Sequence, residues 1–61
     1  MYKVELSENE TILKSKELKD YESAFNCLSG LLKYLGENRK IIVYEKKSSE
    51  WVKFGEWKLQ N

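Results

Sequence analysis

The residues able to do acid–base, nucleophilic or metal chemistry are few in this chain and widely spaced. The sequence has no histidine and a single cysteine, Cys27. A cysteine acts as a nucleophile only beside an activating base or a cation, and one cysteine without histidine cannot build a structural zinc site. The acids Glu8, Glu10, Asp20 and Glu22 fall in expected turns and at a helix start, where carboxylates are ordinary surface groups. We therefore expect a non-enzymatic protein without a cofactor or metal.

Composition excludes further classes of function. Gly30, Gly36 and Gly55 are scattered, so no glycine-rich phosphate loop is present. The net charge of +1 does not indicate binding driven by bulk electrostatics to nucleic acid or to a membrane surface. No apolar run approaches the ~20 residues that span a bilayer, and the alternating start of the chain is unlike a signal peptide. We expect a cytoplasmic protein with no membrane partner.

The segment from Asp20 to Gly36 predicts the one helix of the chain. Its apolar residues recur at the three-and-four spacing of a single helical face centred on Leu28. Asp20 is a good N-cap, and Glu22 adds negative charge where the helix dipole favours it. Gly36 suits the left-handed conformation that often ends a helix.

Two strands are expected on each side of this helix, at residues 2–7, 11–18, 40–46 and 51–59. In the first hairpin, alternation favours pairing of Leu6 with Thr11 and of Val4 with Leu13, and an irregularity near residues 16–18. In the last strand the apolar parity changes at Gly55, which predicts a one-residue bulge at this glycine.

These elements predict one α+β domain over residues 1–61, with β-β-α-β-β order and a four-stranded, mainly antiparallel sheet carrying the helix on one face. The expected core consists of Tyr2, Val4, Leu6, Leu13, Leu18, Ala24, Phe25, Leu28, Leu31, Leu32, Leu35, Ile41, Val43, Val52, Phe54, Trp57 and Leu59. A domain of this size is marginally stable, since it buries only ~60% of its unfolded surface. A homodimer would add buried area, and we expect one.

Two surfaces are candidates for binding a partner. The first is a helix flank with small residues at spacings of four, three and four, formed by Ser23, Cys27, Gly30 and Tyr34. A glycine inside a helix costs ~1 kcal/mol relative to alanine, which suggests close approach of another backbone there. Tolerance of an isolated glycine is the alternative.

The second candidate is the outer face of the sheet, away from the helix. The expected register places Ile12, Ile42, Tyr44, Lys46, Trp51 and Lys53 on it. With Lys3, Lys14, Lys16 and Lys58 against Glu5 and Glu56, this face would carry a charge of +4. Aromatic residues among lysines suit a protein interface, or can stack on and neutralise a single-stranded nucleic acid. An ordinary solvated face with cross-strand pairs is the third reading.

The expected function is therefore a small protein-binding module. Small size and a lysine-rich composition suggest a phage-type inhibitor that occludes a host protein. The alternative is a nucleic-acid-binding module that uses the outer sheet face, although the single arginine speaks against it, because arginine is preferred for bidentate phosphate contacts.

Overall fold

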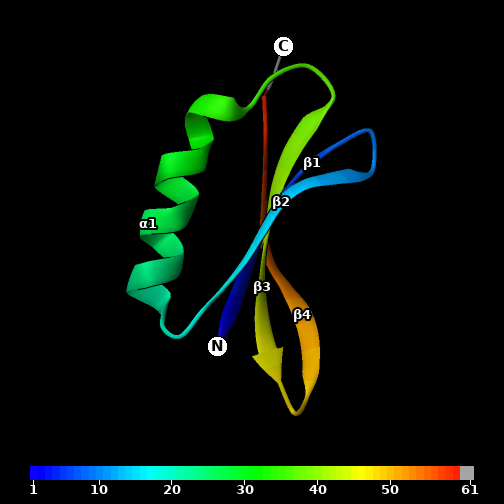
Figure 1. Ribbon diagram of the computed structural model, residues 1–61. Coiled ribbons are helices and arrows are strands. Elements are labelled where there is room, and N and C mark those ends of the chain that lie inside the picture. Colours follow the sequence, from blue (N-terminus) through cyan, green and yellow to red (C-terminus); the bar gives the residue numbers. More distant parts are fainter. Residues whose placement is uncertain (60–61) are drawn as a thin grey trace.

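The computed structural model describes residues 1–59 as a four-stranded antiparallel sheet with one helix on one face, which confirms the predicted α+β class (Figure 1). The elements are β1 (Tyr2–Glu8), β2 (Thr11–Leu18), α1 (Tyr21–Leu31), the single 3-10 turn η1 (Leu32–Tyr34), β3 (Arg39–Lys47) and β4 (Glu50–Lys58). The strand order is β2-β1-β3-β4. The N-terminal hairpin and the C-terminal hairpin therefore meet through β1 and β3 at the centre of the sheet.

Both hairpins close through two-residue turns. Asn9 and Glu10 connect β1 to β2, and Ser48 and Ser49 connect β3 to β4. All four residues have positive φ, between 48° and 72°. This is the pattern of type I′ turns, whose twist matches the right-handed twist of the flanking strands.

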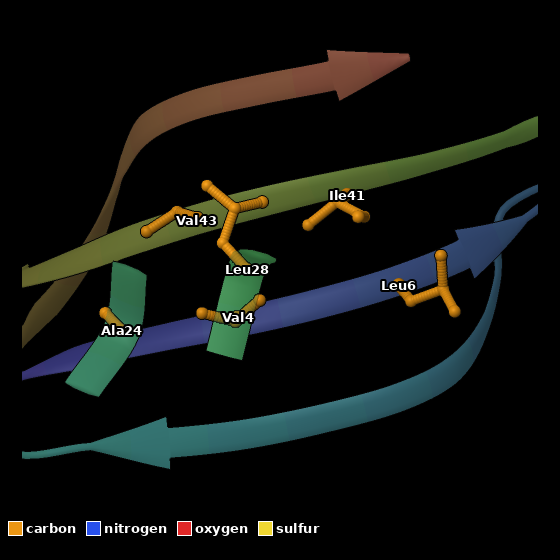
Figure 2. Packing of buried hydrophobic residues seen from close by; sticks show 6 residues of the cluster. All are labelled: Val4, Leu6, Ala24, Leu28, Ile41 and Val43. Carbon is orange, nitrogen blue, oxygen red and sulfur yellow. The ribbon is translucent and has the colours of Figure 1, made fainter. Parts of the chain in front are cut away.

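The core lies between the two central strands and the helix. Val4 pairs with Val43 and Leu6 with Ile41 across β1 and β3, and all four side chains are buried. Figure 2 shows them converging with side chains of α1. The buried apolar cluster consists of Val4, Leu6, Ala24, Leu28, Ile41 and Val43.

The helix covers only part of the sheet. It packs mainly against β1, β2 and β3. A helix with its side chains is ~10–12 Å wide, whereas four strands spaced ~4.8 Å apart span ~14 Å between the outer strand axes. One helix of eleven residues is therefore too narrow for this sheet, and β4 is left largely uncovered.

The first hairpin has a different register from the one expected. Leu6 pairs with Lys14 and Val4 with Lys16, because Leu13 is an extra residue that forms a bulge on β2. The bulge changes the parity of the strand, so Lys14 and Lys16 share the helix side of the sheet with Leu18. The predicted irregularity near residues 16–18 and the predicted outward position of both lysines are wrong.

The last strand contains the predicted change of parity, displaced by one residue. The extra residue is Phe54, which lies between the pairs Tyr44–Lys53 and Val43–Gly55. Gly55 itself has no positive φ. Lys53 and Glu56 consequently lie on the same outer face, where they form an ion pair.

Several residues expected in the core are exposed. Tyr2, Leu18, Leu31, Leu35 and Trp57 are partly buried against the core cluster. The exposed ones are Leu13, Phe25, Leu32, Val52, Phe54 and Leu59. For most of them the reason is the narrow helix, because an apolar residue beside β4 or beyond the helix ends has no second layer to pack against.

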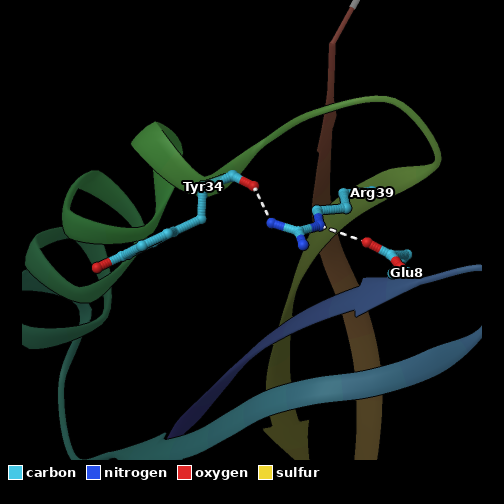
Figure 3. A network of polar contacts seen from close by, with 3 residues as sticks. All are labelled: Glu8, Tyr34 and Arg39. Carbon is cyan, nitrogen blue, oxygen red and sulfur yellow. Dashed lines mark hydrogen bonds and ion pairs between the residues drawn. The ribbon is translucent and has the colours of Figure 1, made fainter.

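A polar network ties the helix end to the sheet (Figure 3). The Arg39 guanidinium donates from Nε to Oε1 of Glu8 at 2.6 Å and from Nη1 to the carbonyl oxygen of Tyr34 at 3.1 Å. It thereby joins the start of β3, the end of β1 and the last residue of η1. The guanidinium group is planar and holds its N–H donors in fixed directions, so it suits such a three-way contact better than the ammonium group of a lysine would.

Candidate protein-binding face

The outer sheet face holds the residues that the sequence placed there on β3 and β4. Ile42 and Tyr44 of β3 alternate outward, and Trp51 pairs with Lys46 and Lys53 with Tyr44. Ile12 of β2 joins the same face through its pairing with Ser7. The expected apolar and aromatic residues are thus on one side of the sheet.

Contacts within the outer face leave few of its groups available to a ligand. Lys3 Nζ lies 5.0 Å from the ring centroid of Tyr44 and 4.9 Å from that of Trp51, and Lys46 Nζ lies 5.6 Å from the Trp51 ring. These are cation–π distances, and both rings are already half-buried beneath lysine side chains. Lys3 also pairs with Glu5 at 3.4 Å.

The charge of this face is smaller than expected. Lys14 and Lys16 belong to the helix side, while Glu17 pairs with Lys3 and so joins the outer face. The face holds the lysines Lys3, Lys40, Lys46, Lys53 and Lys58 and the glutamates Glu5, Glu17 and Glu56. Its formal net charge is therefore +2, and the expected +4 is wrong. The Lys53 contact lowers the pKa of Glu56, as does that of Lys58.

The small-residue flank of the helix lies on the β2 side. Cys27 lines a cavity of about 330 Å³ with Val4, Leu31, Lys14 and Lys16. Ser23 and Gly30 are exposed, and a Cβ atom at Gly30 would have nothing within 4 Å. The ring of Tyr34 lies 5.3 Å from Lys14 Nζ. No close backbone approach within the described residues explains Gly30.

A third surface, which the sequence did not identify, lies between the helix and β4. We call it the helix–β4 face; its centre is formed by Tyr21, Phe25, Phe54 and Trp57, which line one groove. We include Leu32, two helical turns after Phe25, and Val52, on the helix side of β4. Tyr21 is 54% exposed, Phe25 53% and Phe54 50%. An aromatic side chain usually buries ~150–250 Å², so three half-exposed rings leave a large apolar area open to solvent.

The aromatic rings of this face contact one another rather than a second layer of protein. Tyr21 packs edge-on against Phe54 with ring centroids 6.0 Å apart, and it stacks on Phe25 at 6.4 Å. Tyr2 lies 5.9 Å from both Tyr21 and Phe54. Burial in this cluster, together with the nearby charge of Glu45, raises the pKa of the Tyr2 phenol. The rings thus pack against one another within a single copy of the chain.

An apolar groove runs between the helix and β4 within this face. Its cavity volume is about 80 Å³. The lining residues are Tyr21, Ala24, Phe25, Leu28, Val43, Phe54 and Trp57. The lining supplies almost no polar atoms, so the groove suits an apolar side chain rather than a polar small molecule.

The sequence did contain a signal for this face. The apolar residues of the helix extend around its surface from Leu31 on one flank to Phe25 on the other. This arc is wider than the stripe that one sheet face can bury. Comparison of the helix width with the width of four strands would also have predicted an uncovered strand. Neither comparison says which strand it is, because this depends on the strand order.

Other kinds of site find little support among residues 1–59. No group of three or more carboxylate, cysteine or histidine side chains is placed to hold a metal ion there. In the same part of the chain, the structure contains no helix that is long and apolar enough to cross a membrane.

Comparison with known proteins does not assign the chain to a family. No family model matches it, and neither a curated protein nor a solved structure is significantly similar to it.

Proposed function

We propose that the protein is a small, non-enzymatic protein-binding module whose binding surface is the helix–β4 face. The observation that carries the proposal is the half-exposed aromatic cluster of Tyr21, Phe25 and Phe54 beside an apolar groove. Such a module acts by covering part of another protein's surface, and inhibition of that protein would be a direct consequence.

The exposed apolar area of the face supports the proposal. Three half-exposed aromatic side chains contribute on the order of 300 Å², and Leu32 and Val52 extend the patch along the helix and β4. Contiguous apolar patches of ~300–600 Å² are the largest that monomers usually expose, and they are often functional. Rings that already pack against one another also lose less conformational entropy on binding than free side chains would.

The outer sheet face supports binding less well. Four of its five lysines already contact Tyr44, Trp51 or nearby glutamates, namely Lys3, Lys46, Lys53 and Lys58, so a ligand would have to displace these contacts. A formal charge of +2 spread over four strands also provides few free phosphate contacts, on which nucleic-acid affinity depends. The proposal therefore favours protein over nucleic acid.

Binding by paired variants tests the proposal. Immobilised wild-type protein, Phe25→Ser, Phe54→Ser and Ile12→Ser are exposed to an extract of the cells that produce the protein, and bound proteins are quantified by mass spectrometry. Ile12 is a matched control, since it is 55% exposed but lies on the outer face. We expect a partner that both phenylalanine variants lose and that Ile12→Ser retains.

The opposite pattern would contradict the proposal. Partner binding that survives Phe25→Ser and Phe54→Ser but is lost in Ile12→Ser would assign function to the outer face. Circular dichroism of each variant shows whether loss of binding reflects loss of fold.

A further inference from the structure

We infer that the partner of the helix–β4 face is a second copy of this chain, bound across a two-fold axis with the two α1 helices antiparallel. The inference rests on the proposed function, because it concerns the same face, and it names the occupant. Three features carry it: the area of the face, the charges of Glu22 and Lys33 on the helix, and the small residues that come opposite Phe25 of the other copy.

The area suits a small two-fold interface. A stable interface buries ~800 Å² on each partner, and in homodimers ~65% of this is apolar, so ~500 Å² of apolar surface is needed. Tyr21, Phe25 and Phe54 supply ~300 Å² of this. Leu32, Val52 and the partly exposed Trp57 supply most of the remainder.

The rim charges are complementary to themselves under a two-fold operation. Glu22 lies in the first turn of α1, and Lys33 follows three helical turns later in η1. Within the described residues neither side chain forms an ion pair, although Lys33 Nζ lies 5.3 Å from the ring centroid of the neighbouring Tyr34. A two-fold axis that sets the helices antiparallel brings Glu22 of each copy to Lys33 of the other, and a contact of this kind necessarily occurs twice.

The same axis also matches the shape of the helix. Ser29 lies one turn after Phe25 on the exposed side, and the midpoint between Glu22 and Lys33 falls between these two residues. When Glu22 is level with the partner's Lys33, Phe25 is level with the partner's Gly30 and lies within about 1.5 Å along the helix axis of the partner's Ser29. A small residue opposite a large one lets helices approach to the usual ~8–10 Å. Phe54 then lies in the interior beneath the helix pair.

Stability provides a reason for such a dimer. Only six apolar side chains of the described chain are buried in the core cluster, and chains of about 60 residues fold with little margin. Burial of the aromatic cluster between two copies adds apolar contact that one helix cannot provide.

Sedimentation velocity from micromolar to near-millimolar protein tests the inference. We expect wild-type protein to shift from its 7.3 kDa monomer mass to twice that mass as concentration rises. Phe25→Glu should abolish the shift, and Ile12→Glu, on the outer face, should retain it.

Charge reversal tests the antiparallel arrangement. Glu22→Lys alone places two lysines together at both rim contacts, and Lys33→Glu alone places two glutamates together. Each variant should dimerise on the order of tenfold more weakly than wild type, since two exposed pairs become repulsive. An equimolar mixture of the two variants restores both opposite-charge contacts and should dimerise as well as wild type.

The outcomes separate this inference from the proposed function. Monomeric wild-type protein at near-millimolar concentration overturns the dimer, and loss of another partner in Phe25→Ser would then leave the binding face in place. A dimer that forms equally well in Phe25→Glu also overturns this inference, since self-association would use another surface, and the proposed function would still be decided by the partner binding of Phe25→Ser and Phe54→Ser. A mixture that dimerises no better than its components overturns the antiparallel arrangement.

Discussion

The indole ring of Trp57 fills the space above Gly55, so that a Cβ atom at position 55 would lie 2.7 Å from Cη2 of the ring. Both residues face the helix side of β4, where Gly55 pairs with Val43 and Trp57 with Ile41. Trp57 is partly buried against the core cluster and lines the groove, so a shift of its ring would disturb both contacts. The glycine is needed for this contact and not for an unusual backbone angle, since its φ is not positive.

Gly55→Ala should therefore destabilise the protein by about 1–3 kcal/mol, the usual range for overpacking. Gly30→Ala is the matched control, because a Cβ atom there meets nothing within 4 Å. It should stabilise the helix by about 1 kcal/mol. Urea unfolding measures both. In a Trp57→Leu background the Gly55→Ala penalty should disappear, and its persistence would show that the ring is not the cause.

Leu28 and Phe25 lie on different sides of the same helical turn, and their truncation should change the free energy of unfolding by different amounts. Leu28 is 5% exposed in the core, and Leu28→Ala should lower the free energy of unfolding by about 2–5 kcal/mol. Phe25 is half-exposed, so Phe25→Ala should cost about 1 kcal/mol or less in the monomer, although the ring is larger. Thermal unfolding at low micromolar concentration compares them. Equal losses would mean that Phe25 is covered within the monomer.

The element order, the helix start at Asp20 and the central core were predictable because each depends on local pattern. Val4, Leu6, Ile41 and Val43 alternate without interruption, and parity alone places them inward. Both bulges depend on which residue is left without a partner, and this is set by pairing between strands. The apolar residues around Leu13 and Phe54 allow more than one register, so alternation could not identify either as the extra residue.

The exposure of the helix–β4 face was missed for a related reason. Hydrophobicity marks Phe25 and Phe54 as residues that avoid water, but it does not say whether their own chain covers them. The answer depends on the order of strands beneath a narrow helix. Whether these rings are covered is therefore decided by the assembled sheet and cannot be predicted from any single segment.

The β3–β4 turn offers a test of backbone strain. Ser48 and Ser49 have φ values of 48° and 72°, a region that favours asparagine and glycine. Replacement of the pair by Asn-Gly should raise the free energy of unfolding by about 0.5–1 kcal/mol. Ser15→Gly is the control, because Ser15 has no positive φ and lies within β2, where glycine weakens a strand. A destabilised Asn-Gly variant would contradict the type I′ assignment.

Oligonucleotide binding tests whether the outer sheet face binds nucleic acid. Because Lys3, Lys53 and Lys58 already pair with glutamates, single-stranded DNA should bind no more tightly than the ordinary non-specific range of ~10⁻⁴–10⁻⁶ M. Fluorescence anisotropy at two salt concentrations measures this. Tight binding that falls steeply with salt and is lost in Trp51→Ala would instead establish the nucleic-acid function.

The N-cap of α1 makes stability depend on pH in a defined direction. The Asp20 side chain accepts a hydrogen bond of 2.8 Å from the backbone N–H of Ser23. This bond favours the carboxylate and holds the pKa of Asp20 below its ordinary value of 3.8. A group whose pKa is lowered by folding contributes its stability fully above its pKa in the unfolded chain, and that stability is lost as pH falls through its pKa in the folded protein.

Asp20→Ala should therefore lower the melting temperature at neutral pH, and the difference from wild type should shrink steadily below pH 3.8. Glu17→Ala removes a carboxylate from β2 without touching a helix end, and it should leave the melting temperature nearly unchanged at neutral pH. A difference between wild type and Asp20→Ala that stays constant down to the most acidic conditions would show that the charge of the cap contributes nothing to the helix.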